Sequence, residues 1–444
     1  MNVAPATGNS APLPAGVQRS RLRRLRFVCT FIVSLSILEF LIATTSYQIL
    51  RLPPSTDFAT YYISGVLARR ELSPYNQPLM VAQGHALGFE HSQFPYLYPP
   101  PFALAMQPFA SLSYPRARQV WMLLTTLALL ATLGFVAILL RAQARALHLE
   151  HPHLHWLVWT AFVPAALNST SVHNDIRAGS VGIFLAAALA AAAWAVLARR
   201  SALAGSAVAA AALIKLVPVA LVPWLLWRGP RRGAVVALLL LALATTAAVM
   251  HWGWAIFADY IQDALLLAST RELPRPMNQS IDAMLSRLLV PNSDVHAFAD
   301  LPRLKFVLSL GLGLLVVVLT LRTLRTRRQV ALLPVELGMV TLALLALMKI
   351  TWVHTLAAML FVWPCTMLAI ARAAERGAPW AVWLGLLCCA GFFLSSAHFP
   401  LLWHGWTHGP QSLVLNLHGV GVLLLWVVTR WVLVREAEVT GAPA

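Results

Sequence analysis

The sequence is poor in charged residues and in cysteine. Only 11% of its 444 residues are charged, and acidic residues number 16 against 33 basic ones. The four cysteines lie in apolar stretches without metal-ligand spacing, so the sequence predicts no disulfide framework. It also lacks a Walker loop, a GxGxxG motif and a GxSxG motif between a strand and a helix. These absences argue against ATP-driven transport and serine hydrolysis.

Apolar residues dominate instead. They make up 59% of the sequence, mean hydropathy is +0.71, and apolar stretches recur from residue 27 to residue 434. This pattern predicts an all-α polytopic membrane protein. The first stretch, 27–50, is about 24 residues or roughly 36 Å of helix and follows five arginines. We interpret it as an uncleaved signal anchor with a cytoplasmic N-terminus.

The net charge of +17 comes largely from short arginine clusters between apolar stretches, which act as topology signals. One alternating path places all of them on the cytoplasmic side together with both termini, and nucleic acid is not an expected partner. The predicted path contains about twelve transmembrane helices, at 27–50, 118–140, 154–168, 177–198, 203–214, 217–227, 233–251, 304–322, 332–349, 352–371, 379–397 and 414–434.

The expected organisation is one transmembrane domain, 19–436, between a disordered cytoplasmic tail at 1–18 and a cytoplasmic tail at 437–444. Two long segments, 51–117 and 252–303, fall outside the cytoplasm and are too irregular to lie in lipid. Interfacial helices are predicted at 58–70 and 77–88, and whether the stretch 99–112 spans is left open. The expected location is the plasma or inner membrane.

Asp57 is the first acidic residue after the first apolar stretch. Aspartate is a favoured N-cap, so capping of a helix that begins at Phe58 is one interpretation. The other is a general base that removes the proton of an acceptor hydroxyl near the lipid headgroups. Both interpretations fit the position.

Two cations fall on the same outer side. Lys215 lies between apolar residues before Pro218, where a charge is costly unless it is paired or reaches the interface, and a phosphate would be a suitable partner. Arg177 could pair with Asp175 or serve a phosphate from the start of the next helix. For each cation a structural and a functional interpretation stay open.

Further polar residues carry similar alternatives. Lys349 and His354 occupy an outer turn between helices, where a histidine is either a structural hydrogen-bonding group or a catalyst. Glu39, inside the first helix, is expected to face the protein interior or to be protonated. The histidine run at 148–155 lacks a supporting cysteine or a helical carboxylate, so we expect neither a metal site nor a cofactor.

These residues together resemble the GT-C class of membrane glycosyltransferases, and most closely glycosyltransferase family 87, the polyprenyl-phosphate-mannose-dependent α-mannosyltransferases and their relatives. The resemblance depends on several short motifs in the expected order across most of the chain: Asp57-Phe58 with Tyr61-Tyr62, Ser73-Pro74-Tyr75, Tyr98-Pro99-Pro100, Lys215 with Pro218, Asn278-Gln279-Ser280 with Arg287, and Trp352-Val353-His354. Thr355 stands where the family motif has a second histidine, Met348-Lys349 replaces a Ser-Pro pair, and a Gly-Gln-x-Asn pattern reads Gly179-Ser180-Val181-Gly182.

The resemblance implies a GT-C-type helical bundle that transfers a hexose, such as mannose, with inversion from a polyprenyl-phosphate donor to a hydroxyl of a lipid or glycan acceptor. Asp57 would be the base and His354 a second catalytic group. Substrate would contact Tyr61, Tyr62, Arg177, Lys215, Asn278, Gln279, Lys349 and Trp352. Membrane lipids would surround the protein.

Two other classes compete with this hypothesis. A secondary transporter or lipid-linked-sugar flippase also uses charges at membrane depth and broken helices. Against it, the sequence has no internal repeat, and its polar residues gather on one side of the membrane, whereas alternating access needs both. A noncatalytic membrane scaffold would leave the buried lysines and the outer carboxylate without a role.

Overall fold

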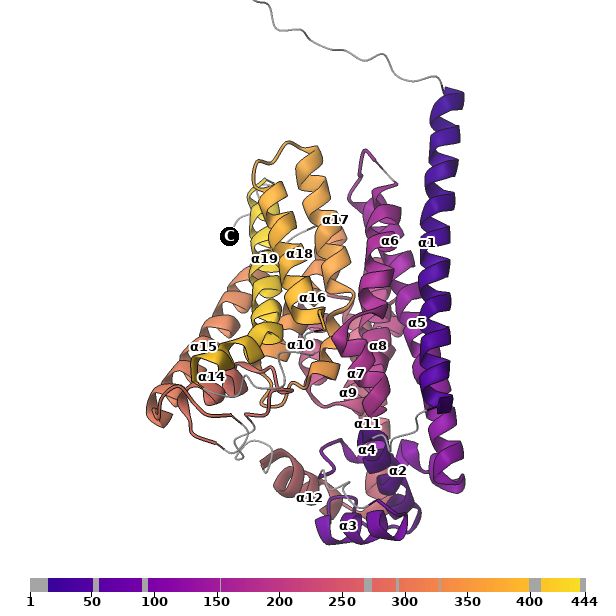
Figure 1. Cartoon of the computed structure of the whole chain (residues 1–444), viewed down its shortest axis with the longest axis vertical. Helices are drawn as coiled ribbons and strands as arrows, with labels where there is room; N and C mark the ends of the chain where they lie inside the picture. The colour runs from indigo at the N-terminus through magenta and orange to yellow at the C-terminus, as the bar shows by residue number, and fades with distance from the viewer. Residues whose placement is uncertain are drawn as a thin grey trace, which may run out of the picture.

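The computed structural model describes residues 15–50, 56–89, 95–151, 153–266, 274–292, 295–326, 329–398 and 409–439. Over these ranges the protein is all-helical, with 80% of residues in helices and no strands (Figure 1). The predicted fold class is confirmed to that extent. Residues 1–14 and 440–444 lie outside the described part, as does most of each predicted tail. Residues 15–18 already belong to the first helix.

The helices follow the predicted apolar stretches closely. Those in the bundle are α1 (Ala15–Leu50), α5 (Tyr114–Ala146), α6 (Leu154–Leu167), α7 (Thr170–Ala178), α8 (Gly182–Leu197), α9 (Ser201–Ile214), η2 (Val217–Ala220), α10 (Leu221–Trp227), α11 (Arg231–Trp252), α15 (Pro302–Arg325), η4 (Val330–Leu332), α16 (Leu333–Leu347), η5 (Val353–Met359), α17 (Val362–Glu375), α18 (Ala381–Ser396), η7 (Gly409–Asn416) and α19 (Leu417–Val439).

The count of twelve membrane spans is not confirmed. Six helical stretches of the described residues are long and apolar enough to cross a membrane, or seven if η5 and α17, bent by about 40°, form one span. Five further apolar stretches, among them 154–167, 201–214 and 217–227, have fewer than 18 residues. Proline and polar residues divide the apolar sequence at these points, so one stretch does not produce one full-length helix.

Helix α1 lies along one edge of the molecule and packs mainly against α6 (Figure 1). Its long apolar side chains are mostly exposed, as expected for a helix that faces lipid. Glu39 is also exposed. The expectation that Glu39 faces the protein interior is therefore wrong, because α1 contacts the bundle through its other face.

Between α1 and α5, the described residues of the first long segment form a compact unit at one end of the bundle (Figure 1). It contains α2 (Thr56–Arg69), α3 (Gln77–Ala86), α4 (Pro100–Met106) and η1 (Phe109–Ser111), and α12 (Ala255–Asp259) lies beside it. Both predicted short helices are present as α2 and α3. The stretch 99–112 does not span a membrane, because α4 has seven residues and η1 only three.

The second long segment carries a π-helix, η3 (Tyr260–Leu266), and α14 (Ile281–Leu289). Helix α14 packs against α15, and its neighbouring residues contact the connection between α16 and η5. This arrangement brings residues near 278 to residues near 351. The contact determines where η5 begins.

Ion pairs join the helix ends at the side opposite η5. Arg228 at the end of α10 binds Glu336 in the first turn of α16 at 2.6 Å, and Arg376 after α17 binds Glu436 in α19 at 3.1 Å. Helix α16 runs from the Glu336 end to η5, and α17 runs from η5 to the Arg376 end. Both of these arginines therefore lie at the end of the bundle away from His354.

Candidate functional site

The site centres on a carboxylate and an imidazole. Asp57 lies in the first turn of α2, and its Oδ2 is 3.5 Å from Nε2 of His354 in η5. This separation is within ion-pair range but beyond an ordinary hydrogen bond. The side chains are 21% and 10% exposed, so the carboxylate is open to a ligand while the imidazole is largely covered. Both predicted catalytic residues therefore meet at one point.

Lys215 reaches the same region from a break in the bundle. Helix α9 ends at Ile214, and Lys215 has an extended backbone. The 3₁₀ turn η2 follows, beginning at Val217 and including Pro218. The ammonium group donates a hydrogen bond of 3.2 Å to Oγ1 of Thr355, the residue after His354. Asp57 also acts electrostatically on Lys215. The helix break thus delivers a positive charge next to the carboxylate and imidazole.

A second carboxylate, Asp175, belongs to the same charge cluster. It is fully buried in α7, and its two oxygens accept hydrogen bonds from the backbone N–H groups of Gly182 and Ile183 at 2.7 and 3.1 Å. These groups are the free donors at the N-terminus of α8. Burial raises the pKa of Asp175 to about 8, while the two N–H donors act in the opposite direction.

The turn between α7 and α8 gives this carboxylate its position. Gly179 adopts a left-handed conformation, φ 65° and ψ 35°, which ends α7 and reverses the chain. Its carbonyl oxygen accepts a hydrogen bond of 2.8 Å from the indole of Trp121. Asp175 consequently turns inward to α8, and Arg177, in the last turn of α7, is exposed. The predicted alternative of an Asp175–Arg177 pair is not present.

Helix α8 approaches η5 so closely that Gly182 has no room for a side chain. A Cβ at this position would overlap the carbonyl oxygen of His354 and approach Oδ1 of Asp175. The contact fixes η5 against the start of α8. It therefore fixes the position of His354 relative to Asp175.

Aromatic side chains form one wall of the site. The hydroxyl groups of Tyr61 and Tyr98 lie 2.6 Å apart, and the Tyr61 ring packs against Trp121 and Phe102. Burial and the nearby charge of Asp57 raise the pKa of Tyr98, so its hydroxyl stays protonated. Tyr62 instead donates to the carbonyl oxygen of Leu112 at 2.7 Å.

A small apolar cavity lies beside Lys215. It is bounded by α8, by the break between α9 and α10, by the end of α16 and by η5. Its walls include Leu189, Leu221, Leu344 and Met348, and its polar groups come from Lys215 and the threonines. A positive charge thus lies at the boundary of an otherwise apolar cavity.

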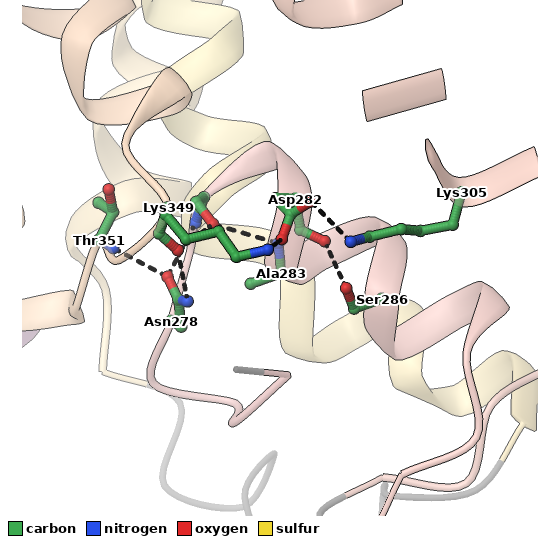
Figure 2. Close-up of polar contacts among 8 residues, drawn as sticks. Asn278, Asp282, Ala283, Ser286, Lys305, Lys349 and Thr351 are labelled. Atoms are coloured by element: carbon green, nitrogen blue, oxygen red, sulfur yellow. Dashed lines mark hydrogen bonds and ion pairs between the residues drawn. The ribbon is translucent and has the colours of Figure 1, made fainter. Parts of the chain in front are cut away.

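The other predicted substrate contacts occupy a separate place. Asn278 and Gln279 are buried, and their side chains bond to backbone groups of neighbouring segments. The ammonium group of Lys349 binds Asp282 at 2.5 Å (Figure 2). Trp352 is half-buried and precedes η5. Of these four, Trp352 is nearest in sequence to the site, two residues before His354.

Sequence reasoning missed three members of the centre. Asp175 was considered only as a partner for Arg177, Tyr98 only as part of a motif, and Thr355 only as a departure from a family pattern. Within the described residues, no group of three His, Cys, Asp or Glu side chains could hold a metal ion. In the histidine run, His151 contacts Glu375 at 3.1 Å.

Comparison with known proteins gives one family match. The model of glycosyltransferase family 87 matches residues 96–348, which is more than half of the chain. Lys215 and Asp175 lie inside the matched range, whereas Asp57 and His354 lie outside it. No curated protein gives a significant match.

Proposed function

The chain belongs to glycosyltransferase family 87, and on this premise we propose that it transfers mannose or a related hexose from a polyprenyl-phosphate donor to a hydroxyl group of a lipid or glycan acceptor. The observation that carries the proposal is the close approach of Asp57 and His354 beside Lys215. A base and a cation next to an apolar cavity suit a donor that combines a sugar, a phosphate and a lipid chain.

The proposed reaction is a direct displacement at the anomeric carbon of the donor. The acceptor oxygen forms a bond to C1 while the bond between C1 and the phosphate oxygen breaks, and its electron pair leaves with polyprenyl phosphate. Asp57 takes the acceptor proton. Attack from the side opposite the leaving group inverts the anomeric configuration. No metal or cofactor takes part in this scheme.

Each charged group has a distinct part in this scheme. Lys215 stabilises the negative charge that develops on the leaving phosphate, and low water content strengthens that interaction. His354 orients Asp57, and its imidazole contacts the carboxylate through Nε2. Arg177 is exposed and near the α7–α8 turn, where it is available to the phosphate or the acceptor.

The shape of the site supports a lipid-linked donor. The phosphate would lie next to the ammonium group of Lys215, where apolar side chains such as Leu221 and Leu344 would contact the first isoprene units. The half-buried Tyr98, which packs on Tyr61 in the aromatic wall, would contact the sugar together with Trp352.

The location follows from charge. Arg228 and Arg376, members of the arginine clusters in the sequence, lie at the bundle end opposite His354, and clustered positive residues favour the cytoplasmic side. The reaction would therefore occur on the extracytoplasmic side of the plasma or inner membrane. A transporter or flippase is less well supported, because the family is one of glycosyltransferases.

A transfer assay tests the function. Purified protein in lipid nanodiscs would be incubated with a membrane-lipid extract and polyprenyl phosphates that carry different radiolabelled hexoses. We expect one label to move to an acceptor in the wild-type protein and not in Asp57→Asn. Transfer from a nucleotide sugar but from none of the lipid-linked donors would overturn the proposal.

A further inference from the structure

The segment 349–353 carries His354 and Thr355 into the site, and most of it lies outside helices. It connects the end of α16 at Leu347 to the start of η5 at Val353, and residues 349–352 lie outside both helices. A backbone outside helices must find hydrogen-bond partners elsewhere to keep one conformation. The position of the imidazole therefore depends on whatever binds this segment.

Asn278 supplies two of these partners from the second long outer segment. Its amide nitrogen donates to the carbonyl oxygen of Lys349 at 3.0 Å, and its side-chain oxygen accepts from the N–H of Thr351 at 2.8 Å. The backbones also pair directly: the N–H of Gln279 binds the oxygen of Thr351 at 2.7 Å, and the N–H of Val353 binds the oxygen of Met277 at 2.9 Å. The segment is held on both sides of Trp352.

Asp282 holds the beginning of the same segment. Figure 2 shows its carboxylate between two lysines, with Lys349 approaching from one side and Lys305 from the other. The two N–O distances are 2.5 and 2.7 Å. Lys305 belongs to α15 and Asp282 to α14. The ion pairs of Asp282 with Lys305 and Lys349 therefore tie two helices to the connection that precedes His354.

Asn278 is itself held by a buried arginine. The Arg287 guanidinium, fully buried in α14, donates to the carbonyl oxygens of Pro274, Arg275 and Asn278 and to the side chain of Asn416. These bonds fix the backbone of Asn278 from behind. A continuous set of hydrogen bonds thus runs from α14 through Asn278 to the residues beside His354.

We propose that Asn278 and Asp282 are positioning residues, which fix the segment 349–353 so that His354 meets Asp57 and Thr355 meets Lys215. This inference rests on the proposed function, because it assigns the two residues an effect on sugar transfer. It replaces substrate contact by Asn278 and Lys349 with an internal role. Both side chains of Asn278 and Lys349 are already bound within the protein, so contact with substrate would require breaking these bonds.

The main test is Asn278→Ala, with Asn292→Ala as its matched control. Asn292 also bonds to backbone groups on both sides, Val290 at 2.9 Å and Val295 at 2.7 Å, but these lie near the end of α14. We expect Asn278→Ala to lower kcat by about tenfold or more with the donor KM within about threefold, since a small displacement of a reacting group is enough for such a loss. Asn292→Ala keeps wild-type turnover.

Two further measurements separate positioning from direct contact. Hydrogen exchange should become faster over residues 351–355 in Asn278→Ala and stay unchanged there in Asn292→Ala. The effect of Asn278→Ala on kcat should also shrink in a His354→Ala background, because a residue that acts through His354 has little left to act on. Fully additive effects, or a higher donor KM with unchanged kcat, would overturn the proposal.

The remaining outcomes are also decisive. If Asn278→Ala does not fold, Asp282→Asn, a same-size change at a partly exposed site, takes its place with the same expectations. If Asn278→Ala is fully active while Asp57→Asn is inactive, the positioning role is wrong and the proposed function stands. If the wild-type protein transfers no sugar, the proposed function fails, and unchanged hydrogen exchange in Asn278→Ala would refute the structural half separately.

Discussion

Gly182 packs directly against the carbonyl oxygen of His354, so that a Cβ at position 182 would overlap it. The backbone of η5 therefore rests on the first turn of α8. This contact joins the imidazole of His354 to the helix whose N-terminus binds Asp175. Two parts of the site that are far apart in sequence thus share one steric constraint.

Gly182→Ala should displace η5 and lower transfer strongly. Overpacking at such a contact destabilises a protein by about 1–3 kcal/mol. The control is Gly134→Ala in α5, where nothing lies within 4 Å of the new Cβ and the helix gains about 0.5–1 kcal/mol. Thermal unfolding and transfer rates measure both effects. An active, stable Gly182→Ala protein would contradict the close approach.

Asp57→Asn should lower turnover by roughly 10²–10⁴-fold, because the amide keeps the size of the side chain but cannot accept a proton. The protein should still insert and remain monodisperse. Asp259→Asn is the control, since Asp259 lies at the end of α12, beside the unit that contains α2, and accepts a hydrogen bond of 2.7 Å from Ser73. If Asp57→Asn keeps most of its transfer activity, Asp57 is a helix-start residue and not the base.

Lys215→Ala should lower kcat/KM for the lipid-linked donor by about 10²–10³-fold, the usual effect of losing one group that stabilises transition-state charge. Thr355→Val is the control, because it removes the hydrogen-bond acceptor of Lys215 and leaves the ammonium group in place. Its loss should stay within about tenfold. Near-normal donor use by Lys215→Ala would show that the lysine only reaches toward the interface.

Asp282 should make stability depend on pH in the acidic range. Burial acts to raise its pKa, but the hydrogen bonds and charges of Lys305 and Lys349 outweigh burial and lower it. A depressed folded-state pKa contributes stability above the unfolded value of about 3.9, and this contribution is lost as the pH falls through the folded value. Thermal unfolding from pH 7 to pH 3 should show a smaller acid-induced drop for Asp282→Asn than for wild type.

Cysteine labelling tests the membrane orientation. In a Cys389→Ser background, which removes the one exposed cysteine among the described residues, a cysteine at the exposed position Phe298 should react with an impermeant reagent added outside. A cysteine at Arg325, at the opposite end of α15, should react after the membrane is opened. The reverse pattern would place the site on the cytoplasmic side.

The sequence by itself determined the helical class and the main site candidates. Hydropathy located most of the long bundle helices, because apolar length is a local property of the chain, but it did not predict the short helices α7, α12 and α14. Rare charges at apolar positions pointed to Asp57, Lys215 and His354, since such groups are costly unless they are used or paired. For Glu39 the same argument left an interior position and a protonated side chain open, because the direction a helix faces depends on its neighbours.

Only the tertiary structure decided which polar residues meet. Asp175 turns to the N-terminus of α8 and not to Arg177, because Gly179 reverses the chain between α7 and α8. Asn278 and Lys349 bond to residues about seventy positions away, and no local pattern encodes that pairing. Long-range packing also divided the predicted span 352–371 into η5 and α17, because buried partners can satisfy backbone groups that lipid cannot.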